Sequence, residues 1–192
     1  MLKFMMWKNK ICLGTAQFSN IYGITNKNKK QINVNEVKKF LLLLKKNKIN
    51  FIDTALSYKN VDKKLSETNI KLNNFNIITK IPKPNKKKSY ENMVLKKILE
   101  SRKRFGIKSF YAVLLHDCHN IKFKDILKIK TAFNLLKKNK LTKKIGISIY
   151  NIAELNYILK FFVPDIIQIP LNMFDKRFIQ KKILNKLSKY KI

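Results

Sequence analysis

The sequence predicts an α/β fold, and three of its features support that prediction. Short apolar runs rich in β-branched and aromatic residues alternate with longer segments whose apolar residues recur at helical spacing. The apolar runs are unbroken, as expected of parallel strands that are buried on both faces. No linker rich in Gly, Pro or Ser divides the 192 residues. These features predict one domain over residues 1–192, built as a parallel barrel or as a doubly wound sheet.

Six strand-then-helix units follow one another along the chain. The predicted strands cover residues 11–16, 50–54, 76–80, 109–115, 144–148 and 165–169. The predicted helices cover residues 34–48, 62–72, 90–105, 123–139, 152–162 and 175–187.

Capping and loop residues justify several of these boundaries. Asn33 is a suitable N-cap for the first helix, because its side chain can accept a hydrogen bond from a free backbone N–H. Pro82 and Pro84 lack the N–H that a continuing strand needs, so the third strand ends before them. Gly106 can adopt the left-handed conformation that commonly closes a helix, here the third one.

The formal net charge of +32 invites a nucleic-acid interpretation, which the kind of basic residue disfavours. Arg makes the best bidentate contacts to phosphates and bases, but only Arg102, Arg104 and Arg177 are present among 43 basic residues. Lys, Asn and Ile all have A/T-rich codons, so an AT-rich genome would enrich all three. We therefore expect a solvated, lysine-rich surface with no specific nucleic-acid partner, although weak, salt-sensitive binding of polyanions is expected.

Neither a membrane segment nor a metal site is predicted. No apolar run approaches the roughly 20 residues of a membrane helix. Residues 1–7 are too short for a secretory signal, so we expect a cytoplasmic location. Cys12 and Cys118 form no C-x-x-C pair. The four residues from His116 to His119 include metal-ligand types, but consecutive loop residues rarely surround one ion.

Four chemically active side chains lie in or just after predicted strands. They are Asp53, Tyr58, Lys80 and His116. A barrel would bring them together, because the C-terminal ends of barrel strands meet at one face. Each residue alone also has an ordinary structural interpretation, as a cap, a half-buried aromatic, a surface charge or a loop histidine.

Taken together, the four side chains suit proton donation to a carbonyl group. A phenol is a poor acid at neutral pH, but a neighbouring ammonium group stabilises the phenolate. Lys80 could supply that charge, and Asp53 could hold Lys80 by a charge-assisted hydrogen bond. His116 could donate a hydrogen bond to the carbonyl oxygen. Tyr58 would then be the proton donor in the reduction of an aldehyde or ketone by hydride.

No G-x-G-x-x-G fingerprint follows the first strand, so a Rossmann dinucleotide site is not predicted there. The sequence instead resembles the aldo/keto reductase family, and in particular a bacterial branch of it. Six motifs in the family's order carry the resemblance: Leu13-Gly14-Thr15-Ala16-Gln17, Asp53-Thr54-Ala55-x-x-Tyr58, Ile78-Thr79-Lys80, Leu114-Leu115-His116, Ile145-Gly146-Ile147-Ser148 and Ile167-Gln168-Ile169-Pro170-Leu171-Asn172.

The resemblance implies a (β/α)8 barrel, of which this chain would supply about six units and lack the last two. It also implies NADPH as the cofactor, with NADH as the alternative, and the catalytic residues Asp53, Tyr58, Lys80 and His116. The cofactor-binding residues that it implies are Gly14, Thr15, Asp53, Ser148 and Gln168. The seventh and eighth units of the family carry its pyrophosphate loop and its 2′-phosphate contacts.

Some residues depart from the family's pattern. Lys59 stands where a Gly usually follows the catalytic Tyr, and Ile149 stands where an Asn often follows the Ser. The substrate expected is a small carbonyl compound, with a keto-sugar as one candidate. Two alternatives stay open: an inactive remnant or fragment of a split reductase, and a basic nucleic-acid-binding protein. An incomplete barrel also predicts exposed strand edges, and with them self-association or a complementing C-terminal fragment, unless the first and sixth strands pair directly.

Overall fold

The sheet of this protein is six-stranded and entirely parallel, and its strands follow one another in sequence order from β1 to β6. The computed structural model describes residues 10–19, 32–85 and 89–192. The strands are β1 (Cys12–Gly14), β2 (Phe51–Asp53), β3 (Asn76–Ile81), β4 (Phe110–Leu115), β5 (Thr142–Ser148) and β6 (Ile166–Gln168). The helices are α2 (Ala16–Ser19), α3 (Val34–Lys46), α4 (Val61–Glu67), α5 (Tyr90–Phe105), α6 (Phe123–Lys138), α7 (Ile152–Ile158) and α8 (Lys181–Lys189), with 3-10 turns η1 (Leu72–Asn74) and η2 (Arg177–Ile179).

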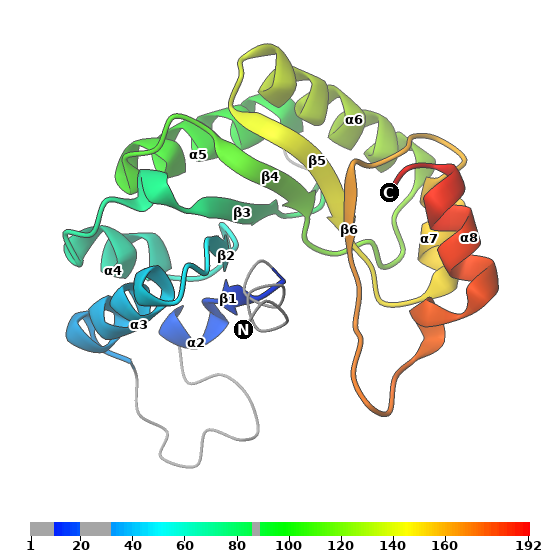
Figure 1. Ribbon diagram of the computed structural model, residues 1–192. Coiled ribbons are helices and arrows are strands. Elements are labelled where there is room, and N and C mark those ends of the chain that lie inside the picture. Colours follow the sequence, from blue (N-terminus) through cyan, green and yellow to red (C-terminus); the bar gives the residue numbers. More distant parts are fainter. Residues whose placement is uncertain (1–9, 20–31, 86–88) are drawn as a thin grey trace.

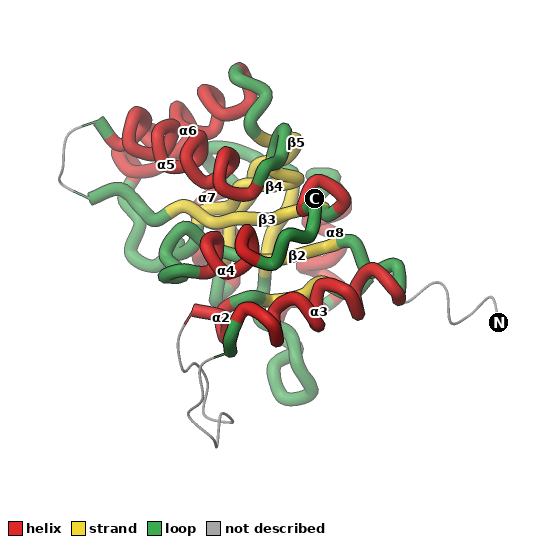
Figure 2. Tube along the Cα trace, turned by 90° about the vertical axis from the view of Figure 1, so that its left-hand side faces the viewer, coloured by secondary structure: helices red, strands yellow, loops and turns green. Residues whose placement is uncertain are grey.

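The sheet curls into half of a barrel, with the helices on its outer side (Figure 1). Helices α3, α4, α5 and α6 follow one another along the outer face of the curved sheet (Figure 2). Among the described residues β1 pairs only with β2, and β6 pairs only with β5. The half-barrel therefore has two open edges, and direct pairing of the first and sixth strands does not occur in it. Leu13, Ile167 and Ile169 near these edges are partly buried against the core, whereas Ile11 is exposed.

The hydrophobic core lies between the outer face of the sheet and the helices. Its largest fully buried side chains include Phe110 of β4, Phe133 of α6 and Phe178 of η2. Burying a side chain of this size contributes about 1.5–3 kcal/mol to stability. This layer fixes the strands relative to one another, and so it positions the residues at their C-terminal ends.

Capping residues behave as the sequence predicts. Asn33 is the N-cap of α3 and forms a capping box with Glu36, whose backbone N–H donates to the Asn33 Oδ1 at 2.9 Å. Gly106 follows α5 with a φ of 62°, the left-handed conformation expected of a closing glycine.

Several predicted boundaries are wrong. The first strand ends at Gly14 because α2 begins at Ala16, and the fifth begins earlier than predicted, at Thr142. The predicted helix over 62–72 ends at Glu67, since Asn69 adopts a left-handed φ of 58° before the turn η1.

Two later helices also differ from prediction. The helix over 152–162 ends at Ile158, because the Lys160 and Phe161 N–H groups donate to carbonyls three residues back, at 3.2 and 2.9 Å, and so form turns in place of a further helical turn. The helix over 175–187 begins only at Lys181, because Gln180 is extended and separates it from the 3-10 turn η2. No helix in the described part of the chain has the length and apolar character needed to cross a lipid bilayer.

Candidate active site

Three of the four predicted catalytic residues lie at the C-terminal ends of adjacent strands. Asp53 is the last residue of β2, Lys80 is the penultimate residue of β3, and His116 follows β4 directly. Because the strands are parallel and in register, their carboxyl ends meet at one rim of the half-barrel.

Tyr58 reaches the same rim from the loop between β2 and α4. Backbone hydrogen bonds fasten this loop to β3: the Thr54 N–H donates to the Ile78 carbonyl at 2.9 Å, and the Leu56 N–H donates to the Lys80 carbonyl at 3.0 Å. The Tyr58 N–H then donates to the Ala55 carbonyl at 3.0 Å, which closes a turn. The loop is therefore held against the strand that carries Lys80.

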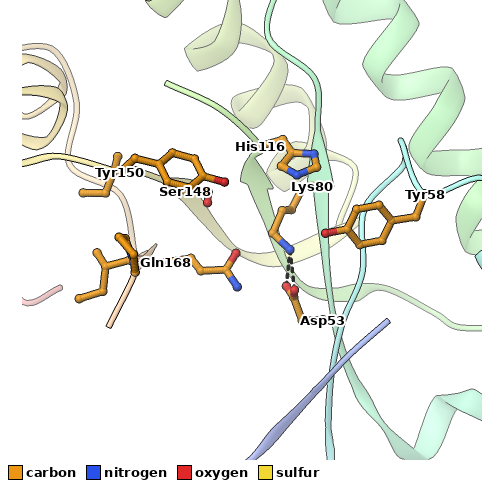
Figure 3. A pocket seen from close by; sticks show the side chains of 10 residues that line it. Asp53, Tyr58, Lys80, His116, Ser148, Tyr150 and Gln168 are labelled. Carbon is orange, nitrogen blue, oxygen red and sulfur yellow. Dashed lines mark hydrogen bonds and ion pairs between the residues drawn. The ribbon is translucent and has the colours of Figure 1, made fainter. Parts of the chain in front are cut away.

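The four side chains line one cavity of about 230 Å³ (Figure 3). Its other lining residues come from the ends of β5 and β6 and the loops that follow them: Ser148, Ile149, Tyr150, Gln168, Ile169 and Pro170. The cavity thus opens at the carboxyl ends of five successive strands, β2 to β6, where the sequence analysis predicts the catalytic side chains.

Lys80 and Asp53 form an ion pair at the base of this cavity. The Lys80 Nζ donates to both carboxylate oxygens of Asp53, at 2.5 and 2.6 Å, and to the Thr54 carbonyl at 3.2 Å. The Lys80 side chain is only 4% exposed, and that of Asp53 is 16% exposed. An ammonium group has three protons to donate, so these three acceptors satisfy Lys80 completely and hold its charge in place.

Tyr58 lies beside this charge, and its hydroxyl points into the cavity toward Lys80 and Asp53 (Figure 3). The Lys80 Nζ is 5.9 Å from the centroid of the Tyr58 ring. An ammonium group at this range stabilises negative charge on a phenol oxygen, which is the arrangement needed for a phenol that gives up a proton.

His116 packs edge-on against Tyr58, with the ring centroids 5.8 Å apart and the ring planes at 80°. Burial lowers the pKa of His116 below its usual value, and the charge of Lys80 lowers it further, while Asp53 and Asp117 act in the opposite direction. The ring is therefore mainly neutral at pH 7, with one nitrogen available as a donor and the other as an acceptor.

Ser148 and Gln168 bring amide-binding groups to the opposite side of the cavity (Figure 3). The Gln168 Oε1 is buried, and among the described residues it has no hydrogen-bond partner. β6 approaches β5 closely at Gly146, where an added Cβ would overlap the Ile166 carbonyl oxygen. The glycine therefore allows the strand pairing that places Gln168 next to Ser148.

Gly14 and Thr15 lie at the end of β1 and are not among the residues that line the cavity. The Thr15 hydroxyl donates to the Asp53 carbonyl at 3.0 Å, and its side chain is fully buried. This contact ties β1 to β2 beneath the ion pair, which is a structural role. The cofactor-binding role of these two residues stays a prediction.

Tyr150 also lines the cavity, and the sequence analysis did not select it. It is 54% exposed and follows β5 by two residues. Its position just after a strand is the signal that could have identified it, because the same rule selected Asp53, Lys80 and His116. Exposed tyrosines near strand ends are too common for that rule to be selective.

Comparisons with known proteins agree with this geometry. The model of the aldo/keto reductase family matches residues 10–192. The structure is similar to an aldo-keto reductase of Bacillus halodurans in its holo form (15% identity, TM-score 0.73), with 95% of this chain covering 59% of that one. It is also similar to an aldo-keto reductase of Bombyx mori in complex with NADP (18% identity, TM-score 0.70), with 95% covering 60%.

An aldo/keto reductase of Brucella melitensis is similar as well, at 25% identity and a TM-score of 0.65, with 94% of this chain covering 64% of that one. The chain thus spans about three fifths of the length of these three proteins. No curated protein sequence matches it significantly. The match over residues 10–192, together with six parallel strands curled into half of the barrel, establishes that the chain belongs to the aldo/keto reductase family, a family of oxidoreductase enzymes.

Proposed function

We propose that this chain carries the carbonyl-reducing centre of an aldo/keto reductase that reduces an aldehyde or ketone with NADPH. The observation that supports the proposal most strongly is a single cavity lined by Asp53, Tyr58, Lys80 and His116. These side chains come from three strand ends and a loop, and a purely structural cluster would not require a buried ion pair beside a phenol and a neutral imidazole.

Each residue has its own role at the carbonyl oxygen of the substrate. His116 donates a hydrogen bond that orients and polarises it, since a neutral imidazole retains one N–H. Tyr58 donates the proton that the oxygen needs as negative charge develops there. Lys80 stabilises the resulting phenolate, and Asp53 keeps the ammonium group in position. A nicotinamide cofactor, when bound, supplies the hydride that reduces the carbonyl carbon.

The cofactor side of the cavity suits a nicotinamide. Its carboxamide has both an N–H₂ donor and a carbonyl acceptor, and the buried Oε1 of Gln168 lacks a donor among the described residues. The Ser148 hydroxyl can serve the same group. We propose NADPH, with NADH as the alternative, and the NADP bound in the similar Bombyx mori structure is consistent with this choice.

A small carbonyl compound is the proposed substrate, and a keto-sugar is one candidate. A cavity of about 230 Å³ in which Tyr150 and Ser148 add hydroxyl groups suits a polar molecule of modest size. Ile149, Ile169 and Pro170 provide apolar contacts around these groups.

Replacement of Tyr58 by Phe tests the proposal. The variant removes the proton donor and leaves the ring in place. Turnover of the chain co-expressed with the C-terminal third of a related reductase, in an NADPH oxidation assay with a panel of small aldehydes and ketones, should therefore fall about 10²- to 10⁴-fold. Tyr157→Phe is the matched control, because Tyr157 is a half-buried tyrosine of α7 that does not line the cavity. An equal loss of activity in both variants would rule out the proposed role of Tyr58, and so would unchanged activity in Tyr58→Phe.

A second proposal concerns the open edges of β1 and β6. The chain spans 59% to 64% of three similar solved structures, and Leu171, Met173 and Phe174 after β6 are strongly exposed. We propose that further strands, from a complementing segment or a second copy, cover these edges, and that the 192 residues alone are weakly active or inactive. Restoration of activity by a co-expressed C-terminal third of a related reductase would support this proposal. A cytoplasmic location and the lack of a specific nucleic-acid partner stay predictions from the sequence.

A further inference from the structure

The ring of His116 makes a contact that the proposed reaction does not by itself require. The Ser57 Oγ lies 3.2 Å from the Nδ1 of His116. Ser57 directly precedes Tyr58 in the same turn, so one short loop supplies both the predicted proton donor and a partner for the imidazole. The neighbouring backbone is fixed as well, since the His116 N–H donates to the Ile81 carbonyl at 2.9 Å.

In a neutral imidazole, this contact affects which ring nitrogen carries the proton. Only one of the two ring nitrogens carries a proton, and the hydrogen bond made by the other nitrogen decides which one it is. If the Ser57 hydroxyl donates to Nδ1, the ring proton lies on Nε2, and Nε2 is a donor. If Nδ1 donates to Ser57, Nε2 carries a lone pair and would repel a carbonyl oxygen.

We propose that Ser57 is a positioning residue, whose hydroxyl donates to Nδ1 of His116 and so presents the Nε2–H to the substrate carbonyl. The part that concerns the carbonyl rests on the proposed function. The choice of the Nε2–H tautomer rests on it too, because the Ser57 contact by itself is compatible with either donor, but the tautomer can be measured without substrate.

The surroundings of His116 favour the neutral ring that this inference needs. Burial lowers the pKa of His116 most and the ammonium group of Lys80 on β3 lowers it further, while the carboxylates of Asp53 and Asp117 act in the opposite direction without reversing the shift. Tyr58 packs against one edge of the ring and limits its rotation. Because the imidazole is neutral and confined, the hydrogen bond from Ser57 can still determine which ring nitrogen carries the proton.

Nitrogen-15 NMR of the whole chain tests the tautomer directly. The chain has two histidines, so a His119→Asn variant assigns the ring signals of His116. At a pH near 7.5 the unaltered protein should show His116 protonated on Nε2. A ring protonated mainly on Nδ1 would overturn the proposal.

Variants at Ser57 give the second arm of the experiment. Ser57→Ala removes one ordinary hydrogen bond, so the ratio of the two tautomers should shift about fivefold toward Nδ1–H. Ser57→Thr retains a hydroxyl group and should restore the original ratio. Ser66→Ala is the control, because the Ser66 hydroxyl donates to the Lys63 carbonyl within α4. Because Ser57 is exposed, the Ser57→Ala variant should fold. An unchanged tautomer ratio in this variant would overturn the proposal.

Kinetics separate this inference from the proposed function. The kcat/KM for a carbonyl substrate should fall about fivefold in Ser57→Ala and recover in Ser57→Thr, with the KM for NADPH unchanged. The expected tautomer ratios without measurable turnover, even when the C-terminal third of a related reductase is co-expressed, would uphold the positioning of His116 and overturn the proposed function alone.

Discussion

Replacement of Lys80 by Met should destabilise this protein far more than replacement of a surface lysine. The Lys80 side chain is 4% exposed and donates three hydrogen bonds, two to the Asp53 carboxylate and one to the Thr54 carbonyl. Met has a similar length but no charge, so the Asp53 carboxylate would lose its partner in a largely buried place.

The expected loss follows from the burial of the pair. Removing one partner of a buried ion pair costs about 3–5 kcal/mol, because the remaining charge is left uncompensated. The Asp53 side chain keeps 16% of its surface exposed, which gives it some access to water and favours the lower end, about 3 kcal/mol. Lys83→Met is the matched control, since Lys83 pairs with Asp117 at 2.9 Å but both side chains are about 40% exposed or more. Such a surface pair contributes about 1 kcal/mol or less.

Urea unfolding followed by circular dichroism measures both variants. The Asp53→Asn variant and the double variant complete a thermodynamic cycle, in which the two changes together should cost clearly less than their sum, by about 1–3 kcal/mol. A loss below 1 kcal/mol in Lys80→Met, or strict additivity in the cycle, would show that the pair is not a tightly coupled buried unit.

Three further predictions concern the rest of the half-barrel. Gly146→Ala should cost about 1–3 kcal/mol in the same unfolding assay, since its Cβ would overlap the Ile166 carbonyl oxygen and lie 2.7 Å from the Ile166 Cγ2; an unchanged stability would contradict the close approach of β5 and β6. The lowered pKa of His116 means that the unfolded state binds a proton more readily, so stability should fall as the pH drops below about 6.5, and His116→Gln should flatten that part of the pH profile. The open edges and the exposed residues Met173 and Phe174 predict binding of hydrophobic dyes and self-association in sedimentation experiments, whereas a clean monomer with a sharp unfolding transition would contradict this prediction.

The sequence was sufficient to predict where three of the candidate site residues lie because the relevant rules are local. Asp53, Lys80 and His116 each lie at the end of an apolar run, and parallel strands bring such ends to one rim whatever the helices between them do. The caps at Asn33 and Gly106 were predictable for the same reason, since each depends on one residue and its own backbone.

Features that depend on tertiary contacts could not be predicted in this way. The interruption at Gln180 separates η2 from α8, although apolar residues continue at helical spacing on both sides. The contact between Ser57 and His116 joins residues 59 positions apart, and it depends on how the turn before α4 is fastened to β3. The fully buried side chain of Thr15 likewise reflects its bond to the Asp53 carbonyl, which no pattern in its own segment indicates.

The division of the site between inner and edge strands predicts which part is less firmly held. Asp53 and Lys80 belong to β2 and β3, and His116 directly follows β4; each of these strands pairs with a strand on both sides. Gln168 instead ends β6, which among the described residues pairs only with β5. An edge strand of three residues opens more readily than an inner strand, because fewer hydrogen bonds must break. Backbone amides of β6 should therefore exchange with solvent faster than those of β3, and NADPH should bind weakly and tighten if the open edge is covered. Equal protection of the two strands would show that β6 is already held as firmly as the interior, and weak cofactor binding would then need a cause other than the open edge.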